Sequence, residues 1–286
     1  MPESPFLEVL AENLAAGVSG RRIESIEIRQ PALLMTASPP ADSFAGEFLS
    51  LPVRRGKYLI LETESRRAIV IHLMRLGRLQ IAPAPASSRQ PPKHVSARIR
   101  FDDDSELRLV EHGTEKRARL WLAEDPDDIA DLKAIGPDPA RGEMDEKAFV
   151  AALRAEPRQL KGFLTDQRAL SGIGNGLSDE ILYEARLSPL QLTRNVADEE
   201  ASRLYRATLT ILEKQIVALR ESAAGALPQR EPSEHYAVHD HAGDKCARCG
   251  QKIARVSYAD RDTFYCPGCQ TGGTPLKDRR LSKLLK

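Results

Sequence analysis

Hydrophobic positions near the start of the chain follow first a helical period and then a strand period. Residues 6–17 carry apolar side chains at positions 6, 7, 10 and 14, which predicts a helix, with Pro5 just before it and Gly17 at its end. Runs of strand-forming residues follow, separated by turn-rich pieces, at 23–29, 58–63, 68–73, 96–101 and 107–110. Residues 1–125 are therefore expected to form a mostly β domain with one leading helix.

The pattern changes to a helical period after the Gly-Pro-Asp-Pro run at 136–139. Predicted helices cover residues 146–155, 159–167, 175–185 and 198–220. A stretch rich in Ala, Gly and Pro, residues 223–235, is expected to be a flexible connection. The second part of the chain is thus a helical domain.

All four cysteines of the chain lie near its carboxyl end. Cys246 and Cys249 form one Cys-x-x-Cys pair, and Cys266 and Cys269 form another, with sixteen residues between the pairs. This spacing is typical of a four-cysteine zinc site, in which protein takes all four positions and the metal is structural. Two disulfides or four free thiols are the alternatives. One structural Zn²⁺ is therefore expected.

Composition changes this picture little. The chain of 286 residues is 41% hydrophobic and 29% charged with a net charge of +1, as is ordinary for a globular protein. Its sequence has no apolar run long enough to span a membrane and no signal peptide, so a cytoplasmic protein is expected. Lys and Arg outnumber Asp from residue 245 to 286, where a basic zinc module could bind phosphates or simply be a solvated tail.

Three short segments are candidates for chemistry. If Met1 is removed, Pro2 offers an α-amino group, a nucleophile at neutral pH, and Glu3 could move protons beside it. Asn175, at the end of a Gly-Ile-Gly-Asn turn that opens a helix, could donate to a phosphate. Lys57 stands at a strand end. The alternatives are a plain helix entry, a helix cap and a solvated strand end.

Taken together, these motifs resemble the formamidopyrimidine-DNA glycosylase / endonuclease VIII family of base-excision repair enzymes. The resemblance runs in order over nearly the whole chain. The matching segments are Met1-Pro2-Glu3-x-Pro5, Arg55-Gly-Lys57-Tyr-Leu, His72-Leu73 with Gly77-x-Leu79, Lys93-His94-Val95, Leu164-x-Asp166-Gln167 through Gly172-Ile-Gly-Asn175, and Arg261 followed by Tyr265-Cys266-Pro-x-Cys269-Gln270.

The resemblance implies an α+β multidomain fold and a division of the chain. Its parts would be a catalytic β-sandwich domain at 1–125, a helix–two-turns–helix DNA-binding domain at 140–222, a zinc finger at 236–272 and a basic tail at 273–286. The partner would be damaged double-stranded DNA, bound by a monomer associated with the nucleoid.

The resemblance also implies a mechanism. A damaged nucleotide would be flipped out of the duplex, and Pro2 would attack its C1′ to form a Schiff base, with Glu3 as proton donor. Strand cleavage by β-elimination, with or without δ-elimination, would follow. The implied catalytic residues are Pro2, Glu3, Lys57 and Arg261, and the implied DNA-binding residues are Arg75, His94, Lys161, Asn175 and Arg261.

Some positions depart from the family pattern. Phe6 replaces a second glutamate, and Arg75 stands where the family has a methionine wedge, unless Met74 takes that role. The family's Arg-Arg-Phe-Gly loop is replaced by the charged segment 111–118. A non-catalytic relative that binds damaged DNA is therefore the alternative function. A zinc-ribbon transcription or RNA factor would explain the cysteines but not the amino terminus.

Overall fold

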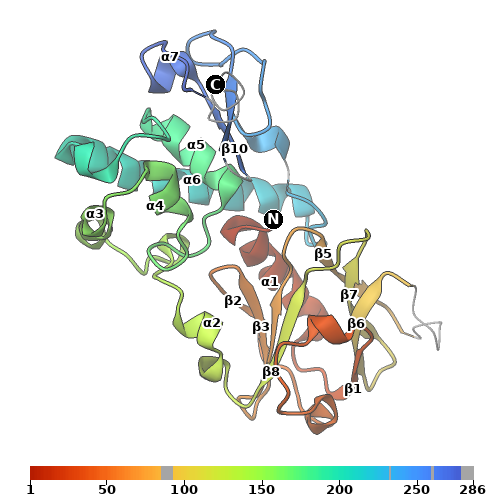
Figure 1. The fold of residues 1–286 in the computed structure, drawn as a ribbon. Helices are drawn as coiled ribbons and strands as arrows, with labels where there is room; N and C mark the ends of the chain where they lie inside the picture. Colours follow the sequence, from red (N-terminus) through yellow and green to blue (C-terminus); the bar gives the residue numbers. More distant parts are fainter. Residues whose placement is uncertain (85–92, 232, 259–260, 278–286) are drawn as a thin grey trace, which may run out of the picture. The chain divides into compact units, whose positions relative to one another are not determined.

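The computed structural model describes residues 1–84, 93–231, 233–258 and 261–277 (Figure 1). The chain forms two compact units. The first consists of Met1–Ala134 and Leu219–Glu231, and the second of Ile135–Ala218 and Pro232–Lys286. None of the helices in the ranges just given is long and apolar enough to cross a membrane.

Two four-stranded antiparallel sheets make up most of the first unit (Figure 1). One sheet has the order β1 (Ile23–Ile28), β6 (Val95–Phe101), β7 (Glu106–Glu111) and β5 (Gly77–Ala82). The other has the order β2 (Val53–Arg55), β3 (Tyr58–Glu62), β4 (Ala68–His72) and β8 (Arg119–Ala123). The expected β domain is confirmed, and β2, β5 and β8 are strands that the sequence pattern did not predict.

Helix α1 (Ser4–Val18) leads into this β domain, as expected, two residues before the predicted start. A proline in its first turn suits a helix start, because the missing N–H has no intrahelical partner there. Its apolar face, with Phe6, Leu10 and Leu14 fully buried, contacts β2 and β3. The first residues of the chain are thereby held at a fixed place on the domain.

Helices dominate the first part of the second unit. They are α3 (Glu146–Ala155), α4 (Leu160–Thr165), α5 (Asn175–Ala185) and most of α6 (Asp198–Ala223). Asp145 caps α3 by accepting from the Ala148 N–H at 2.8 Å. Leucine, isoleucine and phenylalanine side chains from all four helices share one core, in which the rings of Phe149 and Phe163 meet edge to face at 5.4 Å.

Smaller elements complete both units. The second unit ends in an antiparallel hairpin of β9 (Ala254–Tyr258) and β10 (Arg261–Tyr265), followed by α7 (Pro267–Gln270). The short helix α2 (Ala130–Lys133) belongs to the first unit. Short 3₁₀ helices cover Pro31–Leu33, Ala41–Phe44, Pro126–Asp128, Pro139–Arg141, Thr193–Asn195 and Ser233–His235.

The chain returns to the first unit at Leu219, within α6, whose earlier part belongs to the second unit. We call Leu219–Glu231, the piece that comes back, the returning segment. Arg220 pairs with both carboxylate oxygens of Glu12 at 2.6 and 2.9 Å, and the Asn13 side chain donates to the Ala226 carbonyl at 2.7 Å. The Arg78 guanidinium donates to the Gln229 carbonyl. The stretch that composition marked as a flexible connection is, up to Glu231, tied to the β domain.

Candidate functional site

The first residues of the chain lie at the start of α1, where 43% of Met1 is exposed. Pro2 is buried and only 5% of Glu3 is exposed. The Glu3 carbonyl accepts from the Leu7 N–H at 3.1 Å, so Glu3 is the N-cap residue of α1. The Glu3 N–H donates to the Glu231 carboxylate at 2.8 Å, and the ammonium group of Met1 lies 3.4 Å from the other oxygen of that carboxylate.

Lys57 occupies the tight turn between β2 and β3. Gly56 takes the left-handed conformation that this turn requires (φ 56°), and 5% of Lys57 is exposed. Beside the turn, the buried Arg54 guanidinium donates to the Gly56 carbonyl at 3.0 Å and to Glu8 of α1 at 2.7 Å. One arginine therefore couples the helix that carries the amino terminus to the turn that carries Lys57.

His72, at the end of β4, is uncharged at neutral pH. Burial above all, and then the positive charges of Lys57 and Arg119, lower its pKa from 6.5 to about 4. Its Nδ1 accepts from the Met74 N–H at 3.1 Å, which requires an unprotonated nitrogen. Its ring meets the Tyr58 ring edge to face at 4.9 Å. Since the charge of Lys57 acts on it, His72 belongs to the same neighbourhood.

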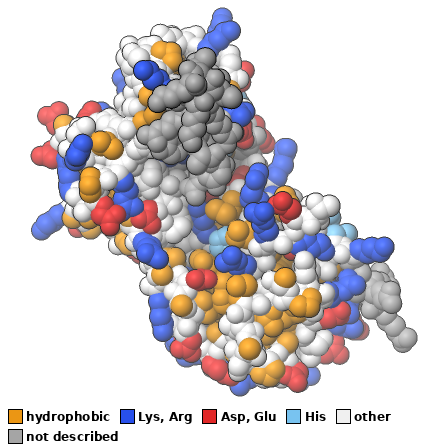
Figure 2. Space-filling view, viewed as in Figure 1, with side chains coloured by type: hydrophobic (Ala, Val, Ile, Leu, Met, Phe, Trp, Pro, Cys, Tyr) orange, Lys and Arg blue, Asp and Glu red, His pale blue; other side chains and the backbone are white. Residues whose placement is uncertain are grey.

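Two turns of the first unit carry the other expected DNA-binding residues. His94 is half-buried with its ring 4.4 Å from that of His112, and burial followed by the His112 charge lowers its pKa. Arg75 is exposed in the turn between β4 and β5. Its neighbour Leu76, which the sequence reading passed over, is 43% exposed. Figure 2 shows hydrophobic side chains gathered on one face of this unit with Lys and Arg among them.

In the second unit, two predicted residues converge on one backbone atom. Lys161 of α4 and Asn175 at the start of α5 both donate to the carbonyl oxygen of Asp262, at 3.3 and 3.0 Å. Asp262 follows Arg261 at the start of β10, so the backbone of Arg261 lies beside both helices. The side chain of Arg261 is outside the described part of the structure.

Lys161 is a buried ion-pair partner rather than an exposed cation. Its ammonium lies 2.5 Å from Asp179, whose side chain is fully buried. The same carboxylate accepts from the Phe264 N–H at 3.2 Å and lies 2.8 Å from His239 Nδ1. Asp179 thus joins α4, α5, β10 and the segment before the first cysteine pair.

A second buried carboxylate of α5 fixes the entry to the zinc-finger region. Glu180 accepts from three successive backbone N–H groups, those of residues 237, 238 and 239, at 2.7 to 2.9 Å. Burial raises its pKa, while the three N–H groups act in the opposite direction. The sequence pattern gave no sign of this contact, because it joins residues far apart in the chain.

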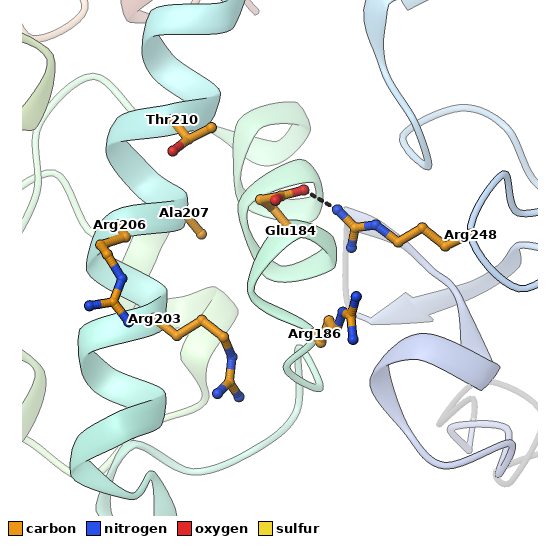
Figure 3. Close-up of a pocket in the computed structure, with 7 residues that line it drawn as sticks. All are labelled: Glu184, Arg186, Arg203, Arg206, Ala207, Thr210 and Arg248. Atoms are coloured by element: carbon orange, nitrogen blue, oxygen red, sulfur yellow. Dashed lines mark hydrogen bonds and ion pairs between the residues drawn. The ribbon is translucent and has the colours of Figure 1, made fainter.

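A shallow cavity of about 680 Å³ lies between α5, α6 and the first cysteine pair (Figure 3). Its charged lining consists of Glu184, Arg186, Arg203, Arg206 and Arg248. Glu184 is paired with Arg248, and Arg203 donates to the Ala185 carbonyl at 2.8 Å. Four of the seven lining residues are arginines and Thr210 supplies a hydroxyl, so the cavity is predominantly cationic.

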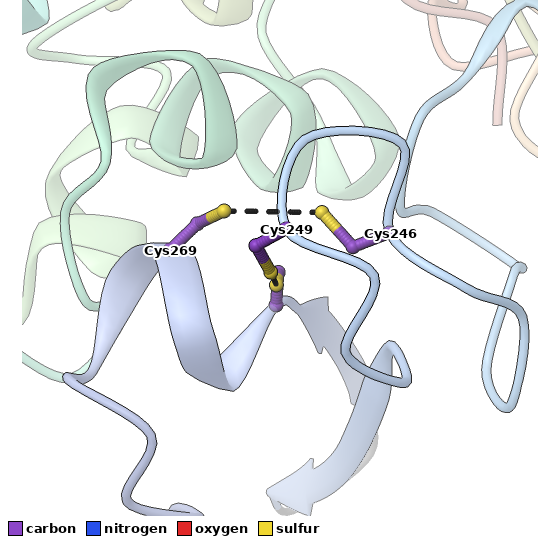
Figure 4. A group of neighbouring side chains, drawn as sticks. Cys246, Cys249 and Cys269 are labelled. Carbon is purple, nitrogen blue, oxygen red and sulfur yellow. Dashed lines mark hydrogen bonds between the residues drawn. The ribbon is translucent and has the colours of Figure 1, made fainter.

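The four cysteine side chains point toward one another (Figure 4). Their Sγ atoms all lie within 4.8 Å, with Cys246 and Cys269 at 3.8 Å and Cys249 and Cys266 at 3.3 Å. Four sulfurs about 2.3 Å from a tetrahedral zinc would lie about 3.8 Å from each other. The Tyr183 hydroxyl is 3.3 Å from the Cys246 Sγ. The residues therefore fit a zinc ion.

The expected site residues fall into two groups. Pro2, Glu3, Lys57, Arg75 and His94 belong to the first unit, and Lys161, Asn175, Arg261 and the cysteines to the second. Within the first unit, Pro2, Glu3 and Lys57 lie on elements that pack together. Within the second, Lys161, Asn175 and the backbone of Arg261 meet at Asp262. Glu231 and Leu76 lie beside members of the first group and were not foreseen.

Three models of known families match the chain. They are the formamidopyrimidine-DNA glycosylase N-terminal domain over residues 1–114, the H2TH domain of the same enzymes over 135–224, and the zinc finger found in FPG and IleRS over 243–272. Together these three models account for most of the sequence.

Relatives and solved structures agree with these models. The chain is 32% identical to the formamidopyrimidine-DNA glycosylase of Chloroflexus aurantiacus and 34% identical to that of Heliobacterium modesticaldum, covering 94% of this chain in each case and 98% and 100% of those proteins. It superposes with a TM-score of 0.82 and 27% identity on the Lactococcus lactis enzyme non-covalently bound to DNA containing an AP site, covering 94% of this chain and 99% of that one. MutM in complex with DNA containing carbocyclic 8-oxo-G gives a TM-score of 0.83 and 28% identity, covering 94% and 100%. The chain belongs to the formamidopyrimidine-DNA glycosylase family of DNA repair enzymes.

Proposed function

We propose that this protein removes oxidised bases from duplex DNA and then cuts the strand at the abasic site. It is a DNA repair glycosylase by its family, and the observation that carries the finer proposal is the burial of Pro2 and Glu3 at the start of α1. Structures similar to it hold DNA with an AP site and DNA with carbocyclic 8-oxo-G. Damaged double-stranded DNA is therefore its partner.

Pro2 is the proposed nucleophile. Its nitrogen is an amide while Met1 is present and becomes a secondary amine when Met1 is removed. The amine forms a bond to C1′ of the flipped nucleotide, and the bond from C1′ to the base breaks with its electron pair leaving on the base. The departing base takes up the proton that the Pro2 nitrogen loses. A proton from Glu3 to the ring oxygen opens the sugar and leaves an iminium on Pro2. The iminium acidifies C2′, whose proton is then lost as the 3′ phosphate leaves by β-elimination.

Phosphate binding is assigned to Lys57, His94, Asn175 and Arg261. Lysine and arginine carry fixed positive charge, and Asn175 stands at a helix start, where backbone dipoles favour an anion. Lys161 acts indirectly, because its ammonium is already paired with Asp179 and holds the Asp262 carbonyl. Arg75 remains a proposed DNA contact, and Leu76 is the apolar side chain beside it that can stack into the gap left by a flipped base.

The zinc finger is proposed to hold one Zn²⁺ through Cys246, Cys249, Cys266 and Cys269. All four ligand positions are filled by protein, so the metal supplies folding free energy to a segment too small for a core of its own. We further propose that the protein works as a monomer at the nucleoid, where its substrate is.

Borohydride trapping tests the nucleophile. Processed protein is incubated with duplexes carrying an abasic site, an oxidised purine or an oxidised pyrimidine, then reduced, and covalent adducts are counted. An adduct mapped to Pro2 by mass spectrometry is expected, and the duplex that traps best identifies the substrate class. A form with one extra residue before Pro2 is expected to trap nothing, because its proline nitrogen is an amide.

Pro5→Ala is the matched control, since it changes a proline three positions away and is expected to trap like the wild type. The non-catalytic alternative would be supported instead if no duplex gave an adduct while the protein still bound abasic DNA. Retention of Met1 in the natively expressed protein would also exclude Pro2 as the nucleophile.

A further inference from the structure

Glu231 is a charged residue from the far end of the first unit's sequence that touches the amino terminus. One oxygen of its carboxylate accepts from the N–H of Glu3, the residue after Pro2, at 2.8 Å. The other lies 3.4 Å from the nitrogen of Met1, the residue before Pro2. The carboxylate therefore spans the backbone on both sides of the Pro2 nitrogen.

The returning segment is built to deliver this carboxylate. Its start is fixed by the pair of Arg220 with Glu12, and its end by Arg78, which donates to the Gln229 carbonyl. Arg78 also lies over the ring of the buried Phe6, with 5.9 Å between the guanidinium carbon and the ring centroid. Phe6 is in the first turns of α1. The helix that positions Pro2 therefore also positions the returning segment, which carries Glu231.

We propose that Glu231 binds the Pro2 ammonium of the processed chain and holds its nitrogen in place for attack. Removal of Met1 leaves the α-amino group on Pro2, between the two backbone nitrogens that the carboxylate already touches. The Pro2 ammonium gives one proton to the Glu231 carboxylate, leaving a neutral amine and a neutral acid. The free electron pair of the nitrogen is then available for C1′. This inference rests on the proposed function of Pro2.

The electrostatics suit this exchange. Burial, and then the negative charge of Glu3, raise the pKa of Glu231 to about 7, whereas the amino terminus acts in the opposite direction. The raised pKa of Glu231 lets its carboxylate take up a proton near neutral pH, as the exchange requires. Arg78 of β5 is a further charged group that acts on Glu231 through its guanidinium, and Arg230 precedes Glu231 in the chain.

The test is the pH dependence of single-turnover trapping with an abasic duplex. In Glu231→Gln, the amine loses a neighbouring negative charge that favours its protonated form, so the acid limb of the profile is expected to move to lower pH by about one unit. The plateau rate is expected to fall about tenfold or more, because the nitrogen is no longer held. Glu231→Asp keeps the charge and is expected to return the limb toward the wild-type pH with a plateau still below wild type.

Glu221→Gln, an exposed carboxylate in the same returning segment, is the matched control and is expected to keep the wild-type profile. Thermal unfolding and binding to DNA with a tetrahydrofuran abasic analogue check that each variant is folded. If Glu231→Gln showed the same acid-limb pH and the same plateau trapping rate as the wild type, the inference would be overturned and the role of Pro2 would remain. No adduct in the wild type would instead overturn the proposed function. If Glu231→Gln does not fold, a Glu231→Asp profile identical to wild type in both limb and plateau would overturn the inference.

Discussion

The side-chain amide of Asn175 donates to the carbonyl oxygen of Asp262 at 3.0 Å, so the start of α5 and the start of β10 form one structure. The Asn175 Oδ1 atom is buried and has no hydrogen-bond partner among the residues that the structure describes. One end of the side chain is thus fixed by the hairpin. The Asn175 side chain is therefore fixed in place before DNA arrives.

Asn175→Ala is expected to weaken binding to abasic-analogue DNA by about tenfold to a hundredfold, the cost of about 1.5 to 3 kcal/mol for a hydrogen bond to a charged group. Because asparagine carries no charge, the loss should be similar at every salt concentration. Fluorescence anisotropy over a salt series measures both quantities. Asn195→Ala, an exposed asparagine of the same unit, should bind like the wild type. Equal affinity of Asn175→Ala and wild type would remove Asn175 from the interface.

Two adjacent arginines give a matched test of the link between α1 and the Lys57 turn. The Arg54 side chain is fully buried and paired with Glu8, whereas Arg55 is exposed and paired with the exposed Asp127. Arg54→Met is expected to lower the free energy of unfolding by about 3 kcal/mol, since it breaks a buried pair. Arg55→Met should change it by less than about 1 kcal/mol.

Urea unfolding followed by the fluorescence of Trp121, the chain's single tryptophan, measures both changes within the first unit. Arg54→Met should also slow borohydride trapping on an abasic duplex, because the turn that carries Lys57 loses the hydrogen bond from Arg54 to the Gly56 carbonyl. Equal stability of the two variants would show that the Arg54–Glu8 pair does not hold this turn.

The first unit is expected to lose stability as the pH is lowered, because His72 resists protonation in the folded state. The folded pKa of His72 is lowered from 6.5 to about 4, so the unfolded chain binds the proton first. The stabilisation is complete above pH 6.5 and is lost as pH falls toward 4, by up to about 3 kcal/mol. In His72→Gln this part of the pH dependence should disappear.

The exposed His112 is the control, because it acts on His94 and not on His72. His112→Gln should therefore keep the part of the pH dependence that is due to His72. An unchanged slope between pH 4 and 6.5 in His72→Gln would mean that His72 is protonated in the folded protein.

Removal of zinc is expected to affect the second unit alone. Metal analysis should find one zinc per chain, and a strong chelator or Cys249→Ser should release it and abolish DNA binding. The environment of Trp121, in β8 of the first unit, should stay as it was. Adding zinc back to the chelated wild type, but not to Cys249→Ser, should restore binding. Binding that survives complete metal loss would show that the finger is dispensable for DNA contact.

Local signals in the sequence predicted the longer elements well. The bounds of α3 and α5 are those expected, because a residue type that favours a helix start stands directly before each of them, Asp145 before α3 and Gly174 before α5. Strands β5 and β8 were missed, although Leu79 and Ile81 of β5 alternate with polar residues and β8 is apolar after Arg119. Each pairs with a strand far along the chain, and local sequence does not show that pairing. The cysteine site was predicted because all its ligands lie within a short span.

The candidate site was foreseen only where motifs are contiguous. Pro2, Glu3 and Asn175 stand out in short signatures, whereas the contact of Glu231 with Glu3 joins positions 228 residues apart. Composition marked the stretch around Glu231 as a connection. Lys161 looked like a cation available to DNA, but its pairing with Asp179 depends on how α4 packs on α5 and could not be read from the sequence.

The return of the chain to the first unit has a consequence for biosynthesis. Pro2 leaves the ribosome first, yet the carboxylate beside it belongs to residue 231 and is made only after the second unit's helices. A nascent chain released early would carry Pro2 and Glu3 without Glu231. Until the last fifth of the protein is being made, the Glu231 carboxylate is absent from the amino terminus, so the proposed removal of Met1 can precede the contact with Glu231.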